Sequence, residues 1–188
     1  VMEAALASHE SSCGLRPVPC QWLRCPGTVA RDAETHDREC RHRPRPLVGG
    51  LKDRVISDDA IEVSSGGEWK KDSRMDGDGW CPKRHDGSQW IEWRVCGQEQ
   101  KPPAIQVIHT KGNFGGGLYY VTEFRLSYSD DDGDSWHDHP QVFEGNADTQ
   151  EEKVNQICPP IVSRVVRLHP TAWRDAIALR AELYGAFE

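Results

Sequence analysis

The sequence predicts a mostly β chain, in which an antiparallel β-sandwich follows a small N-terminal module held by a metal ion. Three observations predict this fold class. Beyond residue 50, short segments of alternating apolar and polar residues are separated by turns rich in Gly, Asp and Pro. The same region contains no long helical period. Four of the seven cysteines lie within the first 40 residues, which contain few large apolar residues.

The composition excludes several classes of protein. Seven Trp, four Tyr and four Phe in 188 residues require a core, so the chain is not intrinsically disordered. A net charge of -7 argues against a nucleic-acid-binding surface. No apolar run approaches the roughly 18 residues that a membrane helix needs. The chain starts at Val1 and has no initiating Met there, so we expect it to be a fragment of a longer protein.

Residues 1–46 are too few to bury a core, so disulfides or a metal must hold them. Cys20 and Cys25 are separated by four residues and His36 and Cys40 by three, with ten residues between the pairs. Two thiolates on a turn, then His and Cys on one helical face, can converge on a tetrahedral ion, and zinc prefers this mixed ligand set. We therefore expect a closed, structural zinc site. A Cys-rich arm, with reduced thiols or a disulfide, is the alternative.

The ligand pattern is repeated. His9 and Cys13, followed by an Arg-Pro pair, return 27 residues later at His36 and Cys40, again followed by Arg-Pro. Repetition at a fixed period indicates tandem modules. We expect His9 and Cys13 to be the last two ligands of an earlier finger whose other ligands lie upstream of Val1.

The link between the two units is Arg16-Pro17-Val18-Pro19-Cys20. With this link and its Cys, Cys, His, Cys ligand order, the segment resembles the TRAF-type zinc fingers, although the gap between the first two ligands is shorter than usual in that family. The resemblance implies rigid spacers and protein contacts. Residues 1–13 would end a truncated upstream finger, and residues 14–46 would form a complete finger and a linker.

The region from residue 47 has the pattern of a sandwich. Pro44, Pro46, Gly49 and Gly50 mark a linker in front of it. Period-two alternation and strand-length apolar runs predict strands at 60–63, 90–95, 104–108, 124–128, 165–168 and 177–184.

Several motifs in residues 47–188 occur in the order found in one family: Gly50-Leu51-Lys52, Gly79-Trp80-Cys81-Pro82, Val142-Phe143-Glu144-Gly145-Asn146 and the run 159–170. The region resembles a discoidin domain, of the coagulation factor V/VIII type C family. The resemblance implies a jelly-roll sandwich, similar to galactose-binding domains. Extracellular members usually tie the two ends of the domain with a disulfide, whereas Ala186 stands at the second position here. Together with the thiolate finger, this predicts an intracellular location, cytoplasmic, cytoskeletal or ciliary, rather than an extracellular one.

The resemblance implies binding through loops at one end of the sandwich, at 66–71, 83–88 and 111–120. Aromatic planes beside polar donors and acceptors suit a sugar ring or a peptide. The alternative is that the aromatic residues pack at the rim. The first loop is short and lacks exposed aliphatic side chains, so we expect no membrane insertion. The candidate ligand-binding residues are Trp69, Lys83, Arg84, His85, Asp86, Asn113, Phe114 and Tyr119.

The segment Ser129–Asp134 has alternating Asp residues, as a calcium-binding EF-hand loop does. It lacks the Glu at the twelfth position, where Gln141 stands, so we favour a hairpin turn over a calcium site. The sequence contains no nucleophile elbow, phosphate-binding loop or His-Glu-x-x-His motif, and we expect no catalysis.

These observations favour a non-catalytic adaptor whose sandwich docks a protein partner, with the zinc fingers as spacer or second contact. One alternative is a lectin-like domain that binds galactose-type glycans. Another is an architectural subunit of a large cytoskeletal or ciliary assembly.

Overall fold

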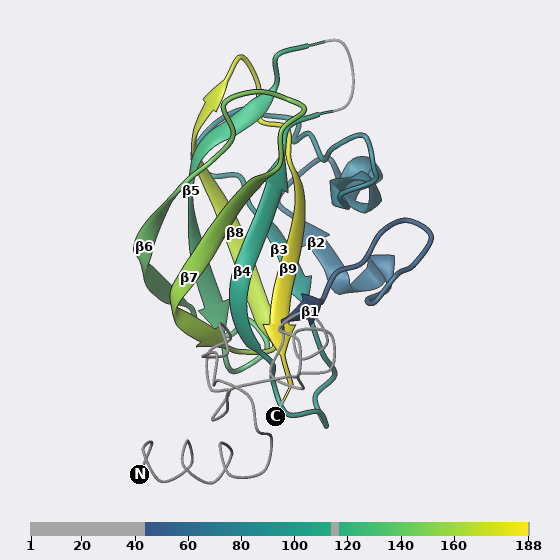
Figure 1. The fold of residues 1–188 in the computed structure, drawn as a ribbon, viewed down its shortest axis with the longest axis vertical. Helices are drawn as coiled ribbons and strands as arrows, with labels where there is room; N and C mark the ends of the chain where they lie inside the picture. Colours follow the sequence, from purple (N-terminus) through teal and green to yellow (C-terminus); the bar gives the residue numbers. More distant parts are fainter. Residues whose placement is uncertain (1–43, 114–116, 188) are drawn as a thin grey trace, which may run out of the picture.

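The computed structural model describes residues 44–113 and 117–187, which form a sandwich of two antiparallel sheets (Figure 1). One sheet has the strand order β1-β9-β4-β7 and the other has the order β2-β3-β8-β5-β6. The expected mostly β sandwich is thus confirmed. The strands are β1 (Arg45–Pro46), β2 (Ile61–Val63), β3 (Ile91–Arg94), β4 (Ala104–Lys111), β5 (Tyr120–Ser129), β6 (His137–Glu144), β7 (Lys153–Val162), β8 (Val165–Arg174) and β9 (Arg180–Ala186), with two 3-10 helices, η1 (Asp58–Ala60) and η2 (Gly67–Ser73).

The predicted zinc module falls entirely on residues before 44. Its ligands therefore lie outside the described residues, and the zinc site stays a prediction: His9, Cys13, Cys20, Cys25, His36 and Cys40.

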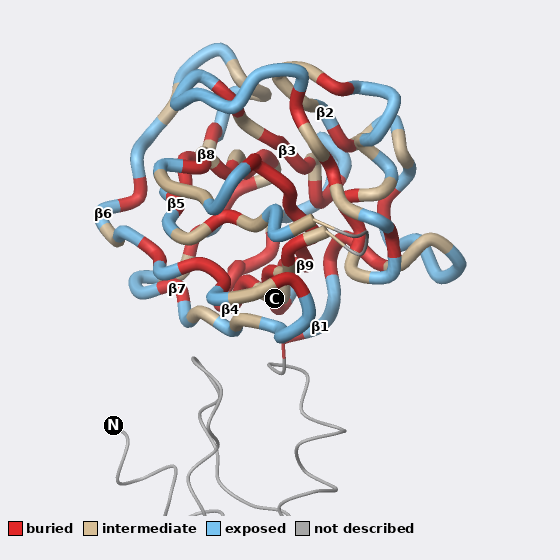
Figure 2. Tube along the Cα trace, turned by 90° about the horizontal axis from the view of Figure 1, so that it is seen from above, coloured by how far each residue is buried: buried red, intermediate tan, exposed pale blue. Residues whose placement is uncertain are grey.

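The core lies between the two sheets. On β5, Phe124 and Leu126 are fully buried, while Arg125 between them is exposed. Phe124 stacks on Phe143 of β6, with ring centroids 5.1 Å apart. Figure 2 shows buried stretches of strand on the inside and exposed segments around them. Full burial of one such side chain stabilises the fold by about 1.5–3 kcal/mol, so this layer fixes the frame that carries the loops.

The predicted strands coincide with β2, β3, β4, β5, β8 and β9, and the structure adds three more. Arg45 and Pro46, predicted as linker, pair with Gly185 and Tyr184, so the sheet begins inside the expected linker. β6 and β7 were not predicted, because prolines interrupt their alternation. Both are edge strands, where a missing backbone N–H is tolerated.

The connections between strands gather at the two ends of the sandwich. Lys111 pairs with Arg180, so β4 ends where β9 begins, and Glu123 pairs with Glu144, so β6 ends where β5 begins. Asn146 joins the two sheets here, because its Nδ2 donates to a carbonyl of β4 at 2.9 Å. We call this end, at the top of Figure 1, the loop end. β1 and the last residues of β9 lie together at the opposite end.

Candidate binding cleft at the loop end

Two buried side chains anchor the loop end. Trp80 is fully buried, exchanges backbone hydrogen bonds of 2.9 and 3.0 Å with Leu179, and donates its indole N–H to the Ser65 carbonyl at 2.9 Å. Arg180 is 5% exposed, and its Nε donates to the Gly112 carbonyl at 2.7 Å. Its Nη2 donates to the Thr149 carbonyl at 3.1 Å and its Nη1 approaches the Met75 carbonyl at 3.4 Å. Loops that are distant in sequence are therefore tied to one strand.

The helix η2 presents Trp69 on this frame. Its N-cap, Gly66, has φ +70°, and a Cβ there would lie 2.3 Å from the Cys81 carbonyl oxygen. Only glycine allows this close approach without strain. The Trp69 N–H donates to the Gly66 carbonyl at 2.9 Å, and the side chain is 51% exposed. The indole ring of Trp69 is therefore exposed to solvent, while its backbone is held in place by this hydrogen bond.

The loop that follows β4 closes through Asn113. The Asn113 backbone N–H donates to the Tyr119 carbonyl at 3.1 Å, and its side-chain amide donates to the Tyr119 and Gly117 carbonyls at 3.3 and 3.2 Å. Gly79 packs against this loop, because a Cβ on it would lie 3.2 Å from the Asn113 Cα. The Tyr119 side chain, 39% exposed, is thereby held beside the segment that follows η2.

These segments enclose a cleft of about 370 Å³. Two exposed aromatic rings, one carboxylate and one thiol face it. Burial raises the pKa of the Cys81 thiol, so this cysteine is protonated at neutral pH and a poor nucleophile. The lining residues are Trp69, Asp78, Gly79, Cys81, Asn113, Tyr119 and Ala178. The arrangement suits the binding of a ligand rather than covalent chemistry.

A model of the F5/8 type C domain matches residues 59–183. The chain belongs to the F5/8 type C domain family. This confirms the discoidin resemblance for the sandwich. Domains of this family are binding modules for proteins, lipids or glycans, and are not themselves catalytic.

Three relatives show the extent of the similarity. Discoidin, CUB and LCCL domain-containing protein 2 of Rattus norvegicus is 30% identical over 156 residues, coagulation factor V of Mus musculus 32% over 192, and lactadherin of Sus scrofa 31% over 158. The alignments cover 72%, 85% and 72% of this chain, but only 20%, 9% and 37% of those proteins. The chain therefore spans a small part of the proteins it resembles.

Solved structures share the fold. Discoidin II of Dictyostelium discoideum superposes with a TM-score of 0.56 at 24% identity, covering 70% of this chain and 55% of that one. CpGH89CBM32-5 of Clostridium perfringens, solved in complex with GalNAc-β-1,3-galactose, superposes with a TM-score of 0.54 at 13% identity, covering 76% and 99% of the two chains.

The candidate residues of this F5/8 type C domain fall into two groups. Trp69, Asn113 and Tyr119 line the cleft together, and their role in binding stays a prediction. Lys83, Arg84, His85 and Asp86 lie on the exposed segment that follows Cys81 and do not line it. Phe114 lies outside the described residues.

The second group has structural partners of its own. The Lys83 ammonium approaches the Glu68 carboxylate at 3.9 Å, and the His85 Nδ1 accepts from the Ile177 N–H at 3.1 Å. Asp86 accepts from the Ser88 and Gln89 side chains, and these hydrogen bonds lower its pKa to about 2. The Asp86 carboxylate therefore stabilises the turn in which it lies.

Sequence reasoning missed Asp78, Cys81 and Ala178 as lining residues. Asp78 lies in an Asp-Gly-Asp-Gly turn, which gives no signal beyond that of a solvated loop. Tertiary contacts, such as the packing of Gly79 on Asn113 and the backbone hydrogen bonds of Trp80 with Leu179, bring this turn to the cleft.

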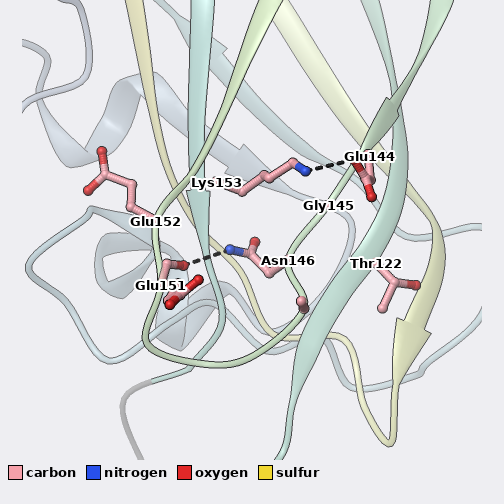
Figure 3. A pocket seen from close by; sticks show the side chains of 8 residues that line it. Thr122, Glu144, Gly145, Asn146, Glu151, Glu152 and Lys153 are labelled. Atoms are coloured by element: carbon pink, nitrogen blue, oxygen red, sulfur yellow. Dashed lines mark hydrogen bonds and ion pairs between the residues drawn. The ribbon is translucent and has the colours of Figure 1, made fainter.

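A second hollow, of about 200 Å³, lies at the same end beside β6 and β7 (Figure 3). Its charged groups are largely satisfied within the protein. The Lys153 ammonium contacts the Glu144 carboxylate at 2.7 Å, and the Glu152 carboxylate pairs with His109 and with Lys111. No aromatic side chain lines it, so the cleft beside Trp69 is the better candidate. Its lining residues are Thr122, Glu144, Gly145, Asn146, Ala147, Glu151, Glu152 and Lys153.

The part of the chain that the structure describes shows neither a cluster of metal-ligating side chains nor a membrane-spanning helix. In residues 44–113 and 117–187, no three His, Cys, Asp or Glu side chains gather where they could hold a metal ion. In the turn considered for calcium, Asp131 accepts hydrogen bonds from the Ser135 side chain and backbone, which lower its pKa to about 2, and Asp132 pairs with Arg94. Among the described residues, no helix is long and apolar enough to cross a bilayer.

Proposed function

We propose that this F5/8 type C domain is a non-catalytic module that docks a protein partner in the cleft between Trp69 and Tyr119. The observation that carries the proposal is the exposure of these two rings, 51% and 39%, on a frame whose anchors are buried. Exposed Trp and Tyr on a rigid base lose little conformational entropy on binding and are enriched in interface hot spots.

A glycan is the second candidate occupant. Aromatic rings beside Asn113 and Asp78 can also stack on and hydrogen-bond a sugar. The structures of similar fold include a family 32 module of Clostridium perfringens NanJ in complex with galactose, with a TM-score of 0.51 at 10% identity. That likeness concerns the fold, so the ligand must be decided by experiment.

The wider setting of the module is part of the same proposal. Cys81, Cys96 and Cys158 are free thiols, which supports a reducing, intracellular compartment. There the N-terminal zinc fingers would serve as spacer or second contact. A fixed place in a cytoskeletal or ciliary assembly would need the same complementary surface.

The test is selection of ligands against the wild-type chain, with a phage-displayed peptide library and a glycan array in parallel. Trp69→Ala removes one wall of the cleft. Phe187→Ala is the matched control, because this aromatic side chain is similarly exposed, at 49%, at the opposite end of the sandwich. We expect enriched peptides whose binding is lost in Trp69→Ala and kept in Phe187→Ala. Ligands that bind Trp69→Ala as well as wild type would contradict the proposal, and glycans alone would replace the protein partner with a sugar.

A further inference from the structure

The cleft combines aromatic walls with an unpaired negative charge. Asp78 is the one charged residue among those that line it, and its side chain is exposed. Within the described residues, no hydrogen bond or ion pair of the Asp78 carboxylate is formed. We propose that the group entering the cleft is a basic side chain, an arginine, presented by the protein partner. This inference rests on the proposed function and names the chemistry of the partner.

Three of the cations near the cleft have contacts elsewhere. Burial lowers the pKa of Arg180 and the charge of nearby Asp78 opposes this effect, but the Arg180 guanidinium is buried and donates to the Gly112 and Thr149 carbonyls and approaches the Met75 carbonyl. Lys83 approaches Glu68 and Lys70 approaches Glu62, each at 3.9 Å. The one charged residue that lines the cleft is an acid, on a chain whose net charge is -7.

A second carboxyl group, that of Asp72, lies near Asp78. Burial raises the pKa of the Asp72 carboxyl, and the nearby Asp78 charge raises it further, against the opposing effect of Lys71. Two acidic groups thus share the segment on one side of the cleft. A cation in the cleft could pair with Asp78.

The protein already holds one of its own arginines with the same set of groups. On the outer face of the five-stranded sheet, the Arg167 guanidinium carbon lies 3.9 Å from the Trp90 ring centroid and 3.8 Å from the Trp136 ring centroid. The Glu92 carboxylate accepts from its Nη2 at 2.8 Å and from its Nε at 3.2 Å. Two aromatic rings and one carboxylate therefore satisfy a guanidinium in this fold.

The cleft offers the same kinds of group without a cation. Trp69 and Tyr119 supply two aromatic rings and Asp78 the carboxylate. A planar guanidinium can stack on a ring while its N–H groups donate to a carboxylate, which an ammonium does less well. This favours arginine over lysine, and a cation over a neutral sugar.

The probe is the tripeptide acetyl-Gly-Arg-Gly-amide, and its control is the same peptide with citrulline, which keeps the shape and loses the charge. Each is titrated into the ¹⁵N-labelled 188-residue chain, and the indole N–H signal of Trp69, assigned by its loss in Trp69→Phe, is followed by NMR. Asp78→Asn is the test variant. Asp134→Asn is the matched control, since it removes the same charge from an exposed position in the turn between β5 and β6, at the opposite end.

We expect the arginine peptide to shift the Trp69 signal saturably and the citrulline peptide to bind at least about tenfold more weakly, the difference between a charged and a neutral hydrogen-bonding partner. Asp78→Asn should lower the affinity for arginine to the citrulline level, and Asp134→Asn should leave it unchanged. Added salt should weaken binding to wild type.

Equal binding of the two peptides, or full binding to Asp78→Asn, would overturn the inference. Galactose is titrated in the same way. If it saturates the Trp69 signal while the arginine peptide does not, the inference fails and the cleft remains a binding site. If selected peptides require Trp69 but contain no basic residue, the inference fails and the proposed function stands. If no ligand depends on Trp69, both fail.

Discussion

Replacement of Arg180 by methionine tests whether one buried side chain holds the loop end together. Its Nε and Nη2 donate to the Gly112 and Thr149 carbonyls at 2.7 and 3.1 Å. Methionine fills similar space but donates nothing, so two buried carbonyl groups lose their donors, at about 1–3 kcal/mol each. Burial lowers the pKa of the Arg180 guanidinium, which reflects a desolvation cost that methionine does not carry. We therefore expect a net loss of about 2–3 kcal/mol, at the low end of the summed cost.

Urea unfolding followed by tryptophan fluorescence measures this loss directly, and calorimetry should show the melting temperature falling by about 4–12 °C. Arg125→Met is the matched control, because Arg125 is exposed on β5 and forms no hydrogen bond or ion pair with the described residues. Its effect should stay within about 0.5 kcal/mol. If Arg180→Met unfolds at the same urea concentration as wild type, the carbonyls are satisfied in another way and the reasoning is refuted.

Three further outcomes are expected. Gly66→Ala should lower the free energy of unfolding by at least about 1 kcal/mol, since alanine at φ +70° would place its Cβ 2.3 Å from a backbone carbonyl oxygen. Gly67→Ala is the control and should cause no such loss, because a Cβ there would meet nothing within 4 Å. Equal thermal stability of the two variants would contradict this prediction. Burial lowers the pKa of His169, so on acidification the unfolded chain gains a proton before the folded one, and the free energy of unfolding should fall as the pH drops below about 6.5. In urea titrations at pH 7.5 and 5.5, His169→Gln should reduce this difference in stability. An unchanged difference between the two pH values would argue against a role for His169. Purified chain should contain about one equivalent of structural zinc that is lost in the double variant Cys20→Ser, Cys25→Ser, with the sandwich still folded; a metal-free wild-type chain would refute the finger.

The strands that the sequence predicted lie in alternating or continuous apolar runs that no proline interrupts. Trp93 and Phe124 lie in such runs and are fully buried in the core. β7 could not be predicted in this way, because Pro159 and Pro160 break its pattern, and only its place at the sheet edge makes them tolerable. β1 depends on pairing with β9, at the other end of the described chain, and no local pattern encodes such a contact.

The cleft was predictable where an exposed aromatic residue interrupts a polar, glycine-rich loop, as at Trp69 and Tyr119. It was not predictable at Asp78, whose position depends on the contact between Gly79 and another loop. His85 differs, because a cluster of polar residues indicated a binding loop, whereas its Nδ1 accepts a hydrogen bond from the protein backbone and the residue does not line the cleft. Its role in binding stays a prediction. Residue type indicates what a loop can bind, whereas packing decides which loops share a site.

The pairing of β1 with β9 has a consequence for how the cleft is displayed. Arg45 faces Gly185, so the chain enters and leaves the sandwich through neighbouring strands at the end remote from Trp69. A segment joined before β1 or after β9 therefore starts at the end of the sandwich remote from the proposed binding cleft, so the domain can be inserted into a longer polypeptide without using the loop end for attachment. Several copies of this domain in one polypeptide, or one copy in each subunit of an oligomer, could bind a repetitive target at the same time. The overall affinity would then exceed that of a single domain.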